Sequence, residues 1–236
     1  MRLKSFYWKR LNGILVEFGG SAVEVPMQRF GRVWSVAMVG LWCSTAALAA
    51  EVIHLAPEAT GVELTLTDGE ELHVTVSELR LDRVDIEGAE WAVVRVPDSH
   101  NLMDRGLPSL PYLASEYLLG RTDGIALELV DRRVRDIDLD TLGFAGVAPS
   151  KGHFDRGTDP ATVPWSFDPK VYTGAGAFPA DDALVGRPFI AGPLRGQALQ
   201  LPVAFWRPDT NTLTVVEEAW FRVVHRPDAE NPRLGP

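Results

Sequence analysis

Gly106-Leu107-Pro108-Ser109-Leu110-Pro111 lies near the middle of this 236-residue sequence, between two segments with β-strand patterns. A proline fixes its own φ angle and favours an extended conformation in the residue before it. Two prolines three residues apart, with leucines beside them, therefore predict a stiff, extended crossing whose leucines help to fill a core. The stretch has no metal-binding, nucleophilic or phosphate-binding pattern, so we predict a structural clamp rather than a ligand loop.

On the N-terminal side of this stretch, apolar and polar residues alternate in short runs. Residues 62–67 and 72–76 both alternate, and Asp68-Gly69 between them has the composition of a turn with positive φ angles. This pattern predicts a β-hairpin. Further strands are predicted over residues 52–55, 79–86 and 90–97.

The C-terminal side continues in the same manner, without any helix of ordinary length that shows a 3.6-residue period. Residues 199–224 alternate around a turn at 208–212 and predict a long closing hairpin. Residues 149–164 contain prolines and glycines with no periodicity, which predicts an exposed loop. Shorter strands are predicted over residues 112–119, 125–130, 134–139 and 185–194. The predicted fold is all-β, a sandwich of antiparallel sheets over residues 51–225, followed by a polar tail at 226–236.

Residues 27–50 have the features of a secretory signal sequence. Arg29 and Arg32 precede an apolar stretch over residues 33–48, and the small residues Ala47 and Ala49 form the pattern that a signal peptidase requires. Cleavage is predicted after Ala49 or Ala50, and the alternative is a single transmembrane anchor. Residues 1–26 are predicted to be a non-structural extension ahead of the signal.

If the chain is exported, its cysteine content and net charge limit the chemistry and the partners of the mature protein. The single cysteine, Cys43, would be removed with the signal, so the mature chain would have neither a disulfide nor a thiol nucleophile. The net charge of -9 argues against a nucleic acid partner. We expect a soluble protein of the cell envelope, periplasm or exterior, with no membrane contact after cleavage.

Three groups of polar residues are candidates for a catalytic or metal-binding site. The aspartates at 131, 136, 138 and 140 could bind calcium, but arginines interleave with them, which favours the polar face of a strand. No two histidines have the spacing of a local zinc site, and neither Ser109 nor Ser115 lies in a nucleophile elbow. No cofactor or metal is predicted. The five histidines are His54, His73, His100, His153 and His225.

The aromatic residues offer one further possibility, a sugar-binding platform. Such a platform could be built from Trp91, Trp165, Trp206, Trp220 and Tyr172. In a sandwich these side chains more often belong to the core or cover an edge. Both interpretations stay open at this point.

A series of short motifs in fixed order resembles the N-terminal propeptide of gingipain-type cysteine peptidases, family C25. The resemblance covers about residues 90–225. Its motif residues include Gly106, Pro108, Leu110, Pro111, Tyr172, Pro179 and Arg195. The motifs are Gly106–Pro111, Gly146–Pro149, Asp168–Tyr172, Phe178-Pro179, Arg195-Gly196, Leu201–Val203 and Thr212-Leu213.

The resemblance implies a β-sandwich prodomain that assists folding and export of a peptidase and keeps it latent. In that family a basic loop side chain occupies the pocket for the substrate's P1 residue, where it meets a carboxylate. Lys151 and Arg156 are the candidates, because they lie on the longest predicted loop.

The resemblance also implies that a peptidase domain should follow, whereas this sequence stops at Pro236. We therefore expect no peptidase activity in this chain. It would be either a truncated precursor or a separate domain that acts on a C25 peptidase in trans. The alternative is a cell-envelope binding module for a glycan or protein, which would use the exposed tryptophans.

Overall fold

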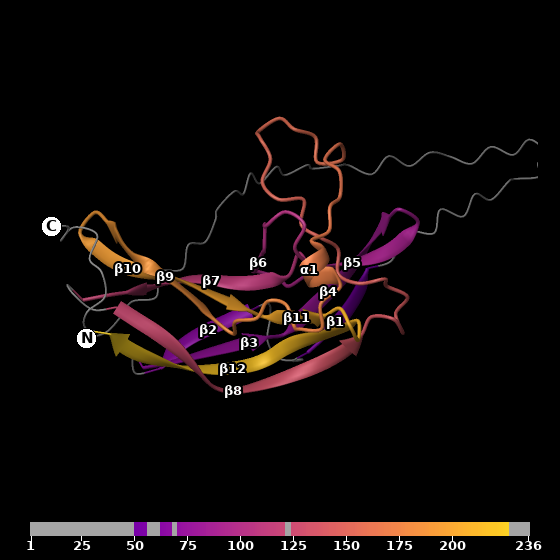
Figure 1. Ribbon diagram of the computed structural model, residues 1–236. Helices are drawn as coiled ribbons and strands as arrows, with labels where there is room; N and C mark the ends of the chain where they lie inside the picture. The colour runs from indigo at the N-terminus through magenta and orange to yellow at the C-terminus, as the bar shows by residue number, and fades with distance from the viewer. Residues whose placement is uncertain (1–49, 56–61, 68–69, 121–123, 227–236) are drawn as a thin grey trace, which may run out of the picture. The chain divides into compact units, whose positions relative to one another are not determined.

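The computed structural model describes residues 50–55, 62–67, 70–120 and 124–226 (Figure 1). These residues all lie in one of two structural units, residues 45–236. The predicted N-terminal extension, almost all of the predicted signal sequence and the Asp68-Gly69 turn lie outside them. Among the described residues, no helix is long and apolar enough to span a membrane.

The predicted all-β class is confirmed, because the described strands pair in antiparallel sheets and the one helix there, α1 (Pro169–Tyr172), has four residues. One sheet has the order β1-β4-β5, a second β6-β7-β10-β9, and a third β11-β12-β3-β2, with β8 also paired to β12. The bounds of the first sheet are β1 (Glu51–His54), β4 (Glu78–Ile86) and β5 (Ala89–Arg95). Those of the second are β6 (His100–Asn101), β7 (Pro111–Leu118), β9 (Leu184–Ala191) and β10 (Leu194–Pro202). Those of the third are β2 (Val62–Thr67), β3 (Glu71–Val76), β8 (Gly124–Asp138), β11 (Ala204–Arg207) and β12 (Thr212–Arg226).

The strands β2 and β3 form the antiparallel pair that the alternating pattern predicted. Val62 lies opposite Val76, and Thr67 lies opposite Glu71. On β3 the side chains of Leu72, Val74 and Val76 are buried and alternate with less buried residues. Alternate residues of a strand point to opposite faces, so the apolar set of β3 lies on the core side.

The strand β8 is continuous, although the sequence predicted two strands at 125–130 and 134–139. It pairs with β12 along its whole length, and two register shifts accommodate the polar stretch between the predicted strands. Such bulges let one strand carry an extra residue without ending the pairing. Arginines in and next to this stretch form ion pairs with acidic residues outside β8. The pairs are Arg132–Asp182, Arg133–Glu217, Arg133–Glu218 and Arg135–Glu217.

The predicted closing hairpin over residues 199–224 is wrong in its first half. β10 pairs with β7 and β9, and only β11 forms a hairpin with β12. Val203 is the point of crossing, since its N–H donates to the Pro111 oxygen and its own oxygen accepts from the Val216 N–H. Pro202 before it has no N–H to donate, which suits the end of a strand.

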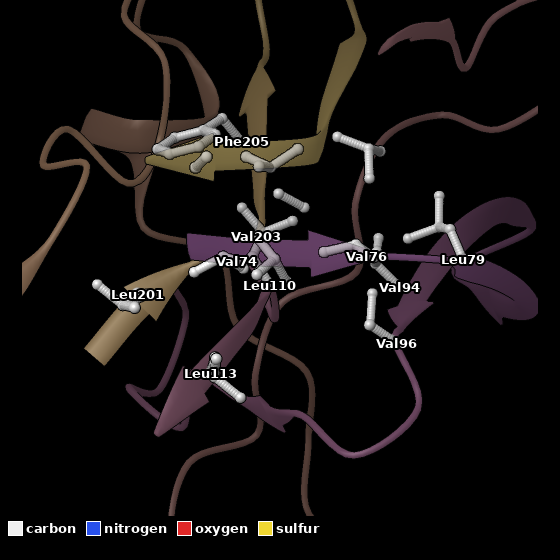
Figure 2. Close-up of a cluster of buried hydrophobic side chains, with 14 of the residues drawn as sticks. Val74, Val76, Leu79, Val94, Val96, Leu110, Leu113, Leu201, Val203 and Phe205 are labelled. Atoms are coloured by element: carbon white, nitrogen blue, oxygen red, sulfur yellow. The ribbon is translucent and has the colours of Figure 1, made fainter. Parts of the chain in front are cut away.

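A single apolar core joins the three sheets (Figure 2). Leu110 of the predicted clamp is completely buried in it, as are Val76, Val94 and Val203. Leu107, the other leucine of the clamp, is only half-buried. The prediction that this stretch helps to fill the core therefore holds for Leu110. The buried side chains that Figure 2 labels are Val74, Val76, Leu79, Val94, Val96, Leu110, Leu113, Leu201, Val203 and Phe205.

Candidate functional site

A loop without helix or strand, residues 150–168, projects from the sheets close to α1 (Figure 1). Gly106 binds both of its ends. The Gly106 N–H donates to the Ser150 oxygen at 2.9 Å, and the Gly106 oxygen accepts from the Asp168 N–H at 2.9 Å. The clamp predicted from the sequence thus closes the base of the loop.

Gly106 has a φ angle of +85°, which side chains with a Cβ rarely adopt. A Cβ at this position would lie 3.4 Å from the Asp168 nitrogen, in ordinary contact. The backbone conformation, rather than lack of space, therefore favours glycine here.

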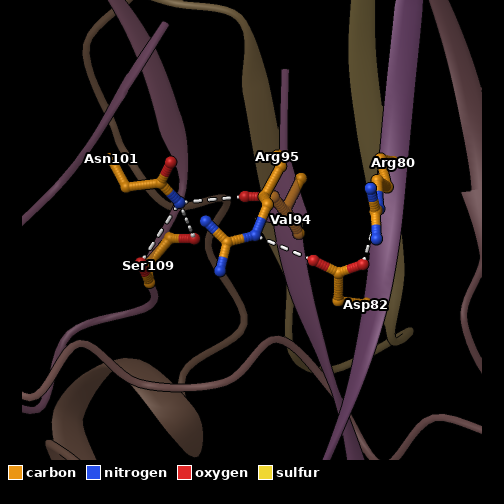
Figure 3. A network of polar contacts seen from close by, with 6 residues as sticks. All are labelled: Arg80, Asp82, Val94, Arg95, Asn101 and Ser109. Atoms are coloured by element: carbon orange, nitrogen blue, oxygen red, sulfur yellow. Dashed lines mark hydrogen bonds and ion pairs between the residues drawn. The ribbon is translucent and has the colours of Figure 1, made fainter. Parts of the chain in front are cut away.

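Asn101 anchors the clamp to the first sheet (Figure 3). Its side-chain nitrogen donates to the Val94 oxygen at 2.9 Å and to the Ser109 oxygen at 3.1 Å. On the neighbouring part of that sheet, Asp82 accepts from the Nε atoms of Arg80 and Arg95. The base of the loop is therefore attached to β5 through the Asn101 side chain, which binds backbone oxygens of both segments.

The tip of the loop is a β-turn that displays Arg156. The Thr158 N–H donates to the Asp155 oxygen at 3.0 Å, and Gly157 has a φ angle of +99°. A positive φ at the third position is the requirement of a type II turn. Arg156 is exposed, and the Phe154 side chain two residues earlier is 42% exposed. The tip therefore exposes both a guanidinium group and an aromatic ring.

Lys151, the other basic candidate, lies in a different setting. Its Nζ donates to the Pro160 oxygen at 2.7 Å and lies 4.2 Å from the centroid of the Trp165 ring. Its ammonium group is thus engaged by the returning half of the same loop. The sequence placed both residues on the loop but could not distinguish these settings.

Four aromatic side chains cluster at the root of the loop. Trp91 lies 4.8 Å from Phe167 and 5.9 Å from Tyr172, and Tyr172 lies 5.2 Å from Trp206, between ring centroids. Together with Ala145 and Pro208 they line an open pocket of about 280 Å³. The Tyr172 hydroxyl donates to the Val147 oxygen at 2.9 Å, and burial raises the pKa of this phenol above its ordinary value.

The five aromatic residues considered for a sugar-binding platform are therefore only partly brought together. Trp91, Trp206 and Tyr172 come together, whereas Trp165 contacts Lys151, and Trp220 stacks on His73 with ring centroids 4.8 Å apart. Phe167 also joins this cluster, although it is not among the five residues of the possible platform. Its ring contacts are with Trp91 of β5 and Tyr172 of α1, and no spacing in the sequence predicts that these residues meet.

The aspartates considered for calcium all accept hydrogen bonds from within the chain. Donors are the Thr214 hydroxyl to Asp136, the Asn211 side chain to Asp140, and backbone N–H groups to Asp131 and Asp138. The part of the chain that the structure describes contains no group of three or more His, Cys, Asp or Glu residues arranged to hold a metal ion.

The remaining motif residues lie in strands or next to them, outside the 150–168 loop. Pro108 forms an isolated β-bridge with Pro149, and Pro111 is the first residue of β7. Pro179 follows a cis peptide bond from Phe178, which exchanges two backbone hydrogen bonds with Trp206. Arg195 is buried on β10 and donates to the Gly120 oxygen. Of the predicted cleavage residues, Ala50 directly precedes β1, and Ala47 and Ala49 lie outside the described residues.

Fold and loop together define a β-sandwich domain that displays a clamped loop with a basic tip. Residues 64–232 match the family model Propeptide_C25. The chain belongs to this family of C25 propeptides, which confirms the resemblance and extends it beyond residues 90–225 at both ends. The match covers the propeptide and no peptidase domain.

Similar curated proteins are gingipains of Porphyromonas gingivalis. Gingipain R2 of strain W83 is 27% identical over 146 residues, which are 60% of this chain and 19% of the relative. Gingipain R1 is 27% identical over 158 residues, which are 65% of this chain and 15% of the relative. The chain thus spans no more than about a fifth of the length of these relatives.

Two solved structures share the fold. One is a complex of the P. gingivalis RgpB pro- and mature domains, with a TM-score of 0.63 and 23% identity over 73% of this chain and 87% of that chain. The other concerns the zymogenic latency of gingipain K from P. gingivalis, with a TM-score of 0.63 and 17% identity over 75% and 99%. Both confirm the prediction of a prodomain-like antiparallel β-fold.

Proposed function

We propose that this domain keeps a C25 cysteine peptidase latent and assists its folding. It would cover the active-site cleft and place a basic side chain from the 150–168 loop in the pocket for the substrate's P1 residue. The observation that carries this proposal is the exposed Arg156 at the tip of a loop whose two ends are bound by Gly106. The RgpB complex of pro- and mature domains supports the choice of partner.

Arg156 suits this role better than Lys151. A guanidinium group can bind a carboxylate through two parallel hydrogen bonds, and it does so most strongly in a site closed to water. An ordered loop also loses less conformational entropy on binding than a flexible one. Lys151 would first have to leave the Pro160 oxygen and the Trp165 ring.

We also propose that the chain is exported, with residues 27–50 as its signal and cleavage after Ala49 or Ala50. The functional domain would then comprise residues 51–225, followed by a tail at 226–236, in the periplasm, the cell envelope or the exterior. The peptidase would be supplied either downstream in the same precursor or in trans. The domain itself would contribute no catalytic group.

Titration of the purified chain against a C25 peptidase that cleaves after arginine tests this function. We expect saturable inhibition at one domain per enzyme. Arg156→Gln should weaken it by at least about 30-fold, since loss of one partner of a desolvated charge pair costs about 2 kcal/mol or more. Arg187→Gln is the matched control, because Arg187 is also exposed but lies on β9. Equal inhibition by both variants would remove Arg156 from the interface.

The aromatic pocket supports a second candidate, a binding module of the cell envelope. Trp91, Phe167, Tyr172 and Trp206 provide ring faces of the kind that stack on sugars or on proline. This function predicts a change in tryptophan fluorescence with a glycan or peptide ligand. Loss of that change in Trp91→Ala, together with no effect of the chain on any C25 peptidase, would favour it over the first.

A further inference from the structure

We infer that Lys151 is a positioning residue that braces the loop and holds Arg156 at its tip, rather than a second residue that enters the partner. The consequence for inhibition rests on the function proposed above. The brace itself is a property of the free chain.

The brace connects the two halves of the loop. Lys151 lies on the outgoing half, directly after Ser150, and both of its contacts lie on the returning half, at Pro160 and Trp165. The hydrogen bond from Nζ to the Pro160 oxygen measures 2.7 Å, and the ammonium lies 4.2 Å from the Trp165 ring centroid. These contacts join the two ends of a shorter segment within the loop, and Arg156 belongs to that segment.

The acceptor on the returning half is itself held in place. Asp159 begins a second turn, in which its oxygen accepts from the Thr162 N–H at 3.0 Å and from the Thr162 hydroxyl at 2.8 Å. Its carboxylate accepts from the Ala161 N–H at 2.9 Å. Pro160 occupies the second position of this turn, where its fixed φ angle is favourable. The carbonyl that Lys151 binds is therefore oriented toward the ammonium group by the bonds of its own turn.

The outgoing half is fixed at the residues on either side of Lys151. The Ser150 hydroxyl accepts from the Gly152 N–H at 3.0 Å, and the Ser150 oxygen accepts from the Gly106 N–H. Gly152 has a φ angle of +77°, and a Cβ there would lie 2.8 Å from the Cβ of Arg105. The Lys151 backbone thus starts from a closely packed base, and its long side chain spans the gap to Pro160.

The hydrogen bonds of the two turns join residues close in sequence, whereas the Lys151 contacts join residues farther apart. The Asp155–Thr158 and Asp159–Thr162 bonds fix the chain only within four residues, whereas the Lys151 contacts join residues 9 positions apart at Pro160 and farther apart at Trp165. Without Lys151 the two halves of the loop could separate, and each isolated turn, closed by only a few local bonds, would then open more often. A charged donor bonded to a carbonyl, together with a cation–π contact, would shift the balance between the ordered and open loop by roughly tenfold or more. The apparent affinity for a partner falls in proportion to the fraction of chains in the competent conformation.

Two substitutions distinguish a role of Lys151 within the loop from direct contact between Lys151 and the peptidase. Lys151→Met keeps an apolar stem and removes the ammonium group, whereas Lys151→Arg keeps a cation that can both donate to Pro160 and stack on Trp165. The first experiment measures hydrogen exchange of the Thr158 and Thr162 amides in the full chain, with amides of β12 as a control for global stability. Exchange at both threonines should be roughly tenfold faster in Lys151→Met and nearly unchanged in Lys151→Arg. Unchanged exchange in Lys151→Met would overturn the brace.

The second experiment measures the association rate with a C25 peptidase that cleaves after arginine. Lys151→Met should slow association, and Lys151→Arg should restore it. An equal loss in both variants, as large as that in Arg156→Gln, would show that Lys151 contacts the enzyme directly and would overturn the inference. If no variant binds any peptidase, the proposed function fails, and hydrogen exchange in the free chain still decides whether Lys151 braces the loop.

Discussion

Gly146 should tolerate a methyl group far less well than Gly157, although both have positive φ angles. Gly146 has a φ of +155° and is buried, and a Cβ there would lie 2.8 Å from Trp91 and 2.9 Å from Trp206. Gly157 has a φ of +99°, and a Cβ there would meet no atom within 4 Å. The pair therefore separates backbone strain from collision with the aromatic cluster.

The expected magnitudes follow from these contacts. Gly157→Ala incurs only the conformational strain of a left-handed residue, about 1–2 kcal/mol. Gly146→Ala would in addition push the new Cβ into the indole rings of Trp91 and Trp206, and overpacking of this kind typically costs about 1–3 kcal/mol. Its total loss of about 2–5 kcal/mol is a large part of the stability of an ordinary domain.

Urea denaturation followed by tryptophan fluorescence measures both losses, because Trp91 and Trp206 report on the cluster directly. We expect the free energy of unfolding of Gly146→Ala to lie at least about 1 kcal/mol below that of Gly157→Ala. If Gly146→Ala yields no soluble protein while Gly157→Ala folds, the order is the same. Equal losses in the two variants would refute the packing of Trp91 and Trp206 against this glycine.

Three further substitutions test the core and the root of the loop, each by the same urea titration. Leu110→Ala should lower the free energy of unfolding by about 2–5 kcal/mol, because the side chain is completely buried and its removal leaves a cavity. Asn211→Ala should cost about 2–4 kcal/mol, since it leaves the Trp206 Nε1 and the Phe144 oxygen without their hydrogen bonds. Tyr172→Phe should cost about 1 kcal/mol by removing the bond to Val147. Burial raises the pKa of Tyr172 above that of an unfolded tyrosine, so above about pH 10 the unfolded chain loses this proton before the folded chain does. The contribution of Tyr172 to the free energy of unfolding should therefore be complete below about pH 10 and decrease as the pH rises further. Tyr172→Phe should lack this part of the decrease.

The sequence predicted the parts of the fold that depend on local pattern. The strands 62–67 and 72–76 are predicted because apolar and polar residues alternate in both, in keeping with a buried face on β3 and partly buried Val62 and Leu64 on β2. The clamp at 106–111 was recognised because proline geometry acts on its own neighbours. The loop that follows Pro149 was found because it lacks both kinds of periodicity.

Features that depend on pairing partners could not be found in this way. The charged middle of β8 interrupts the alternation, yet the strand continues because β12 supplies hydrogen bonds on one side and acidic residues for its arginines. Val203 appeared to lie within one hairpin, whereas its two backbone bonds connect different sheets. The cluster of Trp91, Phe167 and Trp206 is assembled from distant segments, so no spacing in the sequence marks it.

The same distinction applies to the basic loop residues. Composition and position made Lys151 and Arg156 equivalent in the sequence. Their difference arises from the returning half of the loop, where Pro160 and Trp165 receive the Lys151 ammonium. Contacts between two halves of an irregular loop have no periodic signature, so they become visible only in three dimensions.

Substitution of Arg156 by lysine tests most directly whether this side chain occupies the pocket of a C25 peptidase. The inhibition constants of wild type and Arg156→Lys should be measured against one peptidase that cleaves after arginine and one that cleaves after lysine. Wild type should inhibit the arginine-cleaving enzyme more strongly, and Arg156→Lys should reverse that order. An order that stays the same in both proteins would contradict insertion of Arg156 into the pocket.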